Sequence, residues 1–186
     1  SAVTFQTILN SQIRFTNPDI NHYLNGTLVN SQLTGTGNQL FRGQAINSVL
    51  DNVKIDSSII KNSRLIQYYQ EATKYGANKV YDSVIESTRN CSIIRNEEST
   101  AWDTEQLRNL VLVGKSYQWL KDCGIDKLYR FIPFRFSEDR EHDSDGDGIP
   151  DIRDHDNDND GYSDYQELKL SDSFNPFDPD NKPDSS

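Results

Sequence analysis

The residues most clearly suited to a chemical role are carboxylates that recur at fixed spacing between residues 143 and 167. The stretch DSDGDGIPDIRDHDNDNDGYSDYQE contains one pattern twice, and the second copy starts thirteen residues after the first. In each copy acidic residues occupy loop positions 1, 3, 5, 9 and 12, and a glycine occupies position 6. The acidic residues are Asp143, Asp145, Asp147, Asp151 and Asp154 in the first loop, and Asp156, Asp158, Asp160, Asp164 and Glu167 in the second.

This pattern predicts two or more sites for a hard divalent cation, Ca²⁺. Such an ion takes about 6–8 oxygen ligands at roughly 2.3–2.6 Å, and alternating carboxylates around a tight turn supply them. The position-7 backbone carbonyls of Ile149 and Tyr162 would be further ligands, and Glu167 can offer both carboxylate oxygens. We expect the first site to be the weaker, because Asp154 is a shorter acid at position 12.

A solvated, disordered acidic linker is the alternative interpretation, because runs of like charge are commonly disordered. The glycine at position 6 and the hydrophobic residue at position 7 occur in both copies, which favours the metal sites.

The tandem DxDxDGxxDxxD spacing resembles the thrombospondin type 3 repeats, including their bacterial cell-surface relatives, over residues 143–184. Long flanking amphipathic helices, as in a paired EF-hand, are lacking, and Pro150 interrupts the first loop. The resemblance implies closely spaced Ca²⁺ ions wrapped by acidic side chains in a segment with little regular structure. A further ion would use Asp172, Asp178 and Asp180, whose spacing departs from the pattern.

Residues 38–65 have the most regular spacing in the part of the chain that precedes these loops. An apolar residue stands at every fifth position, with a small residue two positions before most of them; the apolar residues are Leu40, Ala45, Leu50, Ile55, Ile60 and Leu65. The spacing resembles the pentapeptide-repeat β-helix, in which apolar side chains stack inward. Two ordinary strands are the alternative, and both interpretations predict β-structure.

Helical patterns follow this β-rich part. Residues 64–88 predict two short helices, although KVYDSVI alternates well enough to form a strand. Residues 103–123 predict a longer helix, because Asp103 and Gln106 fit a capping box and Gly124 fits a C-terminal stop.

The aromatic stretch at 127–136 predicts a strand that Pro133 restricts to a sheet edge or splits in two. These patterns together predict an α+β fold with a β-rich N-terminal half, two or three helices, and an irregular, calcium-wrapped C-terminal segment. Charge supports a boundary after Ser137. Residues 1–137 contain 15 basic and 12 acidic residues, whereas residues 138–186 contain 4 and 17.

Location and redox state are predicted from the same features. The loops suit extracellular calcium concentrations, which indicates an extracellular, cell-surface or periplasmic setting. There Cys91 and Cys123 would form a disulfide worth roughly 3 kcal/mol, two buried free thiols being the alternative. No apolar run reaches the roughly 18 residues that a membrane helix needs. The chain lacks methionine, so we expect a mature product or a fragment.

Function is bounded by missing motifs. The sequence contains no GxSxG, HExxH or phosphate-binding glycine loop, and no Lys/Arg cluster of the kind that binds nucleic acid. We therefore predict a non-catalytic, calcium-stabilised module of a secreted or cell-surface bacterial protein, of the adhesion, matrix or pilus-associated type. Its partner would be a cell-surface protein or a glycan. The alternative is a secreted, calcium-dependent enzyme acting on polysaccharide.

Overall fold

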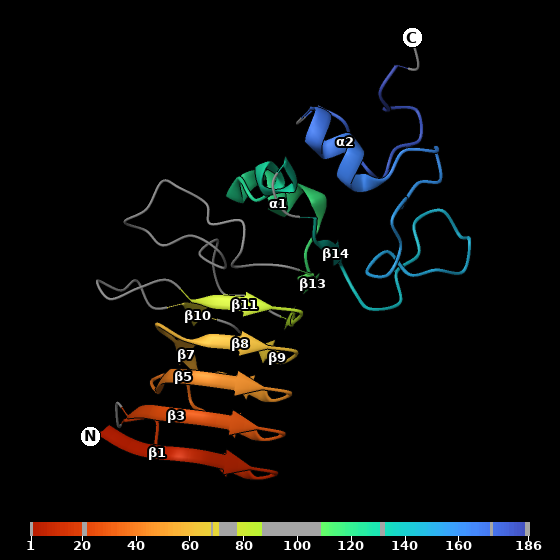
Figure 1. Cartoon of the computed structure of the whole chain (residues 1–186). Coiled ribbons are helices and arrows are strands. Elements are labelled where there is room, and N and C mark those ends of the chain that lie inside the picture. Colours follow the sequence, from red (N-terminus) through yellow and green to blue (C-terminus); the bar gives the residue numbers. More distant parts are fainter. Residues whose placement is uncertain are drawn as a thin grey trace. The chain divides into compact units, whose positions relative to one another are not determined.

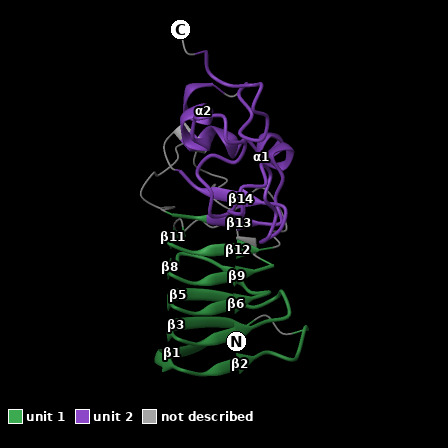
Figure 2. Ribbon diagram, turned by 90° about the vertical axis from the view of Figure 1, so that its right-hand side faces the viewer, with its two compact units in different colours: residues 1–110 green, residues 111–186 purple. Residues whose placement is uncertain are grey.

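Short β-strands and polar corners alternate in the first half of the chain and build a parallel β-solenoid (Figure 1). The computed structural model describes residues 2–19, 22–67, 69–70, 78–86, 109–130, 133–171 and 173–184. Contacts divide the chain into two units, 1–110 and 111–186, so the predicted boundary after Ser137 lies inside the second unit (Figure 2).

Every strand pair of the solenoid is parallel. On one side the strands are β1 (Ala2–Leu9), β3 (Tyr23–Val29), β5 (Leu40–Ile46), β7 (Lys54–Ile55), β8 (Ile59–Lys61), β10 (Tyr69–Gln70) and β11 (Lys79–Tyr81). On the other side they are β2 (Gln12–Arg14), β4 (Gln32–Thr34), β6 (Val49–Asp51), β9 (Arg64–Ile66) and β12 (Val84–Glu86). In this second set, the first residue of each strand pairs with the first residue of the next. The sequence separations of these pairs give the lengths of the four coils, which are 20, 17, 15 and 20 residues.

The solenoid core consists of apolar side chains stacked from coil to coil. Leu33, Leu50, Leu65 and Ile85 occupy equivalent register positions, and each is at most 2% exposed. All six residues at the predicted five-residue spacing are buried. The resemblance to a pentapeptide-repeat coil is therefore confirmed at the level of a parallel solenoid, in which neighbouring coils bury a continuous core.

A repeated Asn-Ser or Asp-Ser pair forms one corner of each coil, and sequence analysis missed it. The corner residues have φ between +45° and +49°, a region that Asn and Asp adopt more readily than most residues; they are Asn10, Asn30, Asn47, Asn62 and Asp82. The residues that follow them form a stack that we call the serine ladder: Ser11, Ser31, Ser48, Ser63 and Ser83. Each serine N–H in the first four coils donates to the hydroxyl of the next serine, at 3.1–3.2 Å.

The second unit begins with β13 (Val111–Val113), which pairs in parallel with β14 (Arg135–Ser137). Helix α1 (Tyr117–Cys123) starts at its N-cap Ser116 and ends at Gly124, whose φ of +70° is left-handed. A 3₁₀ helix, η1 (Asp126–Arg130), and helix α2 (Asp164–Leu170) complete the elements. Their shared core is aromatic and includes Tyr129, Phe134, Phe136 and Phe177.

The predicted α+β fold is wrong. The described residues are β-rich, and their α-helices are two short ones of seven residues each. Within 64–88 the described residues form β9, β10, β11 and β12, because their backbone groups bond to neighbouring coils instead of to their own turn. The predicted helix at 103–123 forms only from Tyr117, since residues 111–113 are a strand, while 103–108 lie outside the described residues.

Two further expectations are corrected in the second unit. The stretch at 127–136 is not one strand, because η1 covers its start and β14 begins after Pro133. The segment after Ser137 is not irregular, because it contains α2 and two loops with extensive internal hydrogen bonds. Cys123 is disulfide-bonded; Cys91 lies outside the described residues, so their pairing stays a prediction. Among the described helices, none has the length and apolar character to cross a membrane.

Candidate metal centre

The two acidic loops have the same internal geometry, which follows from their common spacing. At position 1, Asp143 Oδ2 accepts from Gly148 N–H at 2.9 Å, and Asp156 Oδ2 accepts from Gly161 N–H at 3.1 Å. The two glycines have φ of +96° and +97°, which explains why position 6 is glycine in both loops. The glycine turns the chain so that the position-1 carboxylate faces the loop interior.

Positions 3, 5 and 7 repeat in the same way. The N–H groups of Ile149 and Tyr162 each donate to the position-5 carboxylate, Asp147 or Asp160, at 2.7 Å. The position-5 N–H groups donate in turn to the position-3 carboxylates, at 2.9 Å in the first loop and 3.3 Å in the second. These bonds aim three carboxylates of each loop at a common point.

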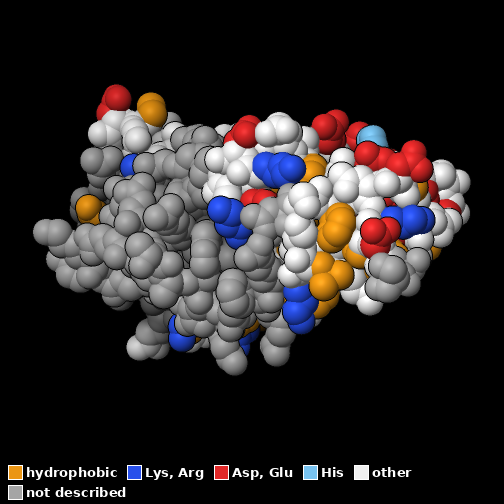
Figure 3. Space-filling view, turned by 90° about the horizontal axis from the view of Figure 1, so that it is seen from above, with side chains coloured by type: hydrophobic (Ala, Val, Ile, Leu, Met, Phe, Trp, Pro, Cys, Tyr) orange, Lys and Arg blue, Asp and Glu red, His pale blue; other side chains and the backbone are white. Residues whose placement is uncertain are grey.

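Two carboxylate clusters result. Within each, one oxygen from every residue lies within 4.8 Å of the others; the clusters are Asp143, Asp145 and Asp147, and Asp156, Asp158 and Asp160. Figure 3 shows acidic side chains (red) gathered at one side of the surface in view, with a histidine among them. Oxygens at this separation suit a Ca²⁺ ion bound between them.

Position 9 has a different role in both loops. Asp151 Oδ1 accepts from Ser144 N–H at 2.9 Å, and its Oδ2 accepts from the Ser144 hydroxyl at 2.8 Å. Asp164 makes the same pair of bonds with Asn157, at 2.9 Å and 2.6 Å. The position-9 carboxylate therefore fixes position 2 and closes the loop. The spacing of the acidic residues did not indicate this role, although a polar side chain stands at position 2 in both copies.

Position 12 distinguishes the two loops. Asp154 Oδ1 accepts backbone N–H bonds from His155 and Asp156, at 2.6 Å and 3.1 Å, so it connects the first loop to the second. Glu167 projects from α2, is fully buried, and has no hydrogen-bond partner on either carboxylate oxygen. The N-cap residue of α2, Ser163, forms a capping box with Gln166, and this box fixes the start of the helix that carries Glu167.

The second loop thus contains buried oxygens without partners. Besides both oxygens of Glu167, Asp158 Oδ2 and Asp160 Oδ2 are buried and make no hydrogen bond. In the first loop Asp145 Oδ2 is in the same condition. Buried carboxylates without a partner are costly unless a cation or donor compensates them. The residues therefore fit a divalent ion, and the fit is most complete at the second loop.

The pKa values of the carboxyl groups in the second loop also favour a bound cation. Burial, together with the nearby carboxylates of Asp158 and Asp160, raises the pKa of Glu167 to about 8. Burial also raises the pKa of Asp164 to about 8 and that of Asp158 to about 6. A bound divalent cation would supply the positive charge that keeps these groups ionised.

A third ion site is not assembled by the described residues. Asp178 Oδ1 accepts from Asp180 N–H at 3.2 Å, within a local turn, and Asp172 lies outside the described residues. The clusters found in the described part of the chain are the two above. No protein-family model, curated protein or solved structure matches this chain.

Proposed function

We propose that this chain is a non-catalytic module of a secreted or cell-surface protein, of the adhesion, matrix or pilus-associated type, and that it binds at least two Ca²⁺ ions. Asp143, Asp145 and Asp147 would hold one ion, with Asp154 beside them. Asp156, Asp158, Asp160 and Glu167 would hold the other. The ions would supply charge compensation and cross-linking within the loops, and no chemical step.

One observation carries the calcium proposal. Four carboxylate oxygens of Asp158, Asp160 and Glu167 are buried together without a hydrogen-bond partner, on a loop that its own backbone bonds hold in shape. A solvated acidic linker would keep its carboxylates in water, where they lose no hydration. The resemblance to thrombospondin type 3 repeats supports calcium as the metal and a cell-surface setting.

Calorimetric titration of the metal-stripped protein tests the proposal. We expect at least two Ca²⁺ ions bound per chain, with the second loop filling at the lower concentration. A stoichiometry below two, or a preference for Zn²⁺ over Ca²⁺, would contradict it. Turnover of anionic polysaccharides in a panel assay would instead support the secreted, calcium-dependent enzyme.

A further inference from the structure

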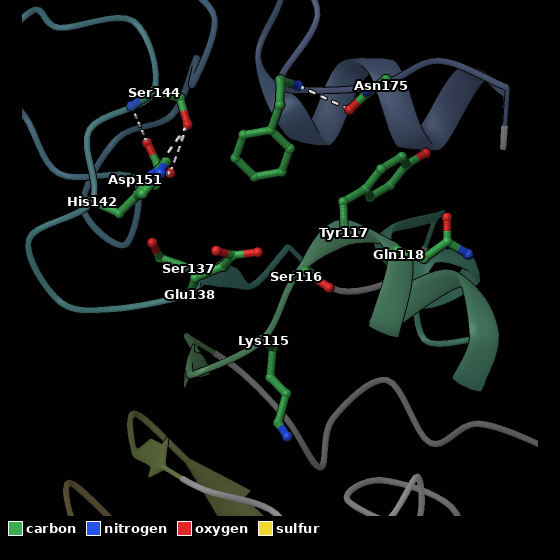
Figure 4. Close-up of a pocket in the computed structure, with 11 residues that line it drawn as sticks. Lys115, Ser116, Tyr117, Gln118, Ser137, Glu138, His142, Ser144, Asp151 and Asn175 are labelled. Atoms are coloured by element: carbon green, nitrogen blue, oxygen red, sulfur yellow. Dashed lines mark hydrogen bonds and ion pairs between the residues drawn. The ribbon is translucent and has the colours of Figure 1, made fainter.

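A pocket of about 320 Å³ lies within the second unit (Figure 4). Residues from four segments line it: the start of α1, the end of β14, the first acidic loop, and the segment that follows α2. Its volume is at the lower end of the range for small-molecule sites, which suits a ligand of one or two rings. The metal clusters do not occupy it, because none of their six aspartates lines it.

Two aromatic rings form the apolar part of the pocket. Tyr117 and Phe177 have ring centroids 6.3 Å apart, at an interplanar angle of 55°. The Tyr117 hydroxyl donates to the Phe174 carbonyl at 2.7 Å, and Phe177 packs edge-on against Phe136 with centroids 5.3 Å apart. Both rings are therefore held in place before any ligand arrives, which lowers the entropic cost of binding.

Two polar groups at the end of β14 are left for a ligand. Ser137 is 2% exposed, and its buried hydroxyl makes no hydrogen bond. Glu138 is exposed, and its carboxylate forms no hydrogen bond or ion pair with the described residues. Figure 4 shows both side chains between the labelled residues of the acidic loop and those of α1. A buried hydroxyl without a partner is costly, and a ligand hydroxyl would satisfy it.

The first acidic loop supplies the remaining wall. His142 Nδ1 lies 2.9 Å from Asp151 Oδ2, and Asp151 N–H donates to the His142 carbonyl at 2.8 Å. The ring is thereby oriented by the same carboxylate that fixes Ser144, and its Nε2 makes no bond to the described residues. The position-9 carboxylate thus shapes both the loop and one side of the pocket.

We propose that this pocket binds a pyranose sugar. The C–H faces of a pyranose pack against aromatic rings. Its hydroxyls can both donate and accept hydrogen bonds, and so can match the acceptor and donor groups of Glu138, Ser137 and His142. An anionic ligand fits less well, because Glu138 and Asp151 would repel it. The lining lysine, Lys115, holds its ammonium 4.2 Å from the Trp119 ring centroid instead.

Calcium should strengthen sugar binding, and this part of the inference rests on the proposed function. An ion at the first cluster would stabilise the loop that carries His142, Ser144 and Asp151. Anything that binds the ordered loop and not the disordered one adds to its stability. A chelator should therefore weaken binding of the sugar without the sugar touching the ion.

The test measures sugar binding to the full chain by ligand-observed NMR, with a panel of free neutral and N-acetylated monosaccharides, and by a glycan array for chain-terminal sugars. Glu138→Gln keeps the size of an exposed side chain and removes its charge. Its matched control is Glu141→Gln, which is exposed and lies outside the pocket lining. We expect Glu138→Gln to weaken binding about tenfold or more, since hydrogen bonds to charged groups contribute most.

The outcomes separate the pocket from the metal sites. Binding lost in Glu138→Gln, kept in Glu141→Gln, and accompanied by unchanged calcium stoichiometry in both supports the pocket. No binding by any monosaccharide or array glycan, or equal affinity of native protein and Glu138→Gln, overturns it even if both calcium ions bind. Sugar affinity unchanged by chelator overturns the calcium dependence.

Discussion

Glu167 is the carboxylate of the second loop whose ionised form is most costly without a cation, because it is fully buried and both its oxygens lack a hydrogen-bond partner. Replacing it with glutamine should weaken calcium binding at that loop about tenfold or more, since loss of even an indirect metal partner costs about that much. Calorimetry should show one weakened site and one unchanged site.

The same substitution should have the opposite effect without calcium. With excess chelator, Glu167→Gln removes a carboxyl whose ionisation burial opposes, so the free energy of unfolding should rise. Glu141→Gln, which changes an exposed carboxylate, should leave stability and calcium affinity as they are. If Glu167→Gln destabilised the protein equally with calcium and with chelator, Glu167 would be a packing residue and no ligand.

The serine ladder gives a second prediction at this scale. Ser63→Ala removes the hydroxyl that accepts from the buried Ser48 N–H at 3.1 Å and donates to the Lys61 carbonyl at 2.7 Å. Leaving a buried N–H without a partner should lower the free energy of unfolding by about 1–3 kcal/mol, measured by urea titration.

Ser11→Ala is the matched control for that variant. Ser11 occupies the same corner of the first coil, but its hydroxyl accepts no N–H from the described residues and donates only to the Leu9 carbonyl. We expect a change of about 0.5 kcal/mol or less. Equal losses in both variants would show that the serines act through corner conformation and not through the ladder.

Residue types and spacing were enough to predict the two clusters, because positions 1, 3 and 5 of a tight turn are local neighbours. They were not enough to predict how Asp151 and Asp164 act. Each was expected to be a ligand, which stays a prediction; in the structure each also accepts hydrogen bonds from the position-2 residue on both oxygens. These hydrogen bonds depend on how the loop closes, and residue spacing alone does not specify the loop closure.

At the scale of elements, helix α2 is the part that couples folding to the second loop. Ser163 caps it by accepting from Gln166 N–H at 3.2 Å, and Gln166 accepts in return from Ser163 N–H at 2.9 Å. Ser163→Ala should cost about 0.5–2 kcal/mol of helix stability. Because Glu167 lies in the first turn, calcium affinity at the second loop should fall as well.

Fluorescence or calorimetric titration of Ser163→Ala measures this coupling. Ser171→Ala, at the other end of α2, serves as the control, because among the described residues its hydroxyl bonds only to Ser173. A Ser163→Ala protein with a less stable helix and unchanged calcium affinity would mean that Glu167 is positioned by the surrounding core and not by the cap.

Strands of two or three residues explain why elements were harder to predict than the site. KVYDSVI was open to both interpretations, and it forms β11 and β12 around the Asp82 corner. The strand conformation is decided by hydrogen bonds to the coil about 20 residues earlier, and local residue propensity carries no information about those bonds. The corner pair was overlooked because coils of 20, 17, 15 and 20 residues show no constant period.

At the scale of the whole molecule, we expect calcium removal to affect the two units differently. The solenoid has its own stacked apolar core, whereas the acidic loops have buried carboxylates that calcium would compensate. Hydrogen exchange with chelator should show loss of protection in residues 142–171, while strands β3, β5 and β6 keep theirs. Simultaneous loss in both would mean that calcium also stabilises the solenoid.

The serine ladder repeats the same contact from coil to coil, which suggests that one coil can be removed. Residues 47–61 run from one Asn corner to the residue before the next, so their removal would join Ile46 directly to Asn62. Ser31 N–H would then donate to the Ser63 hydroxyl, and Leu33 would stack against Leu65, so these two contacts keep the same residue types. We expect this shortened chain to fold with a parallel-β circular dichroism spectrum, whereas a deletion shifted by two residues should not. Folding of the shortened chain would show that the length of the solenoid can change by a whole coil while the stacked core is kept.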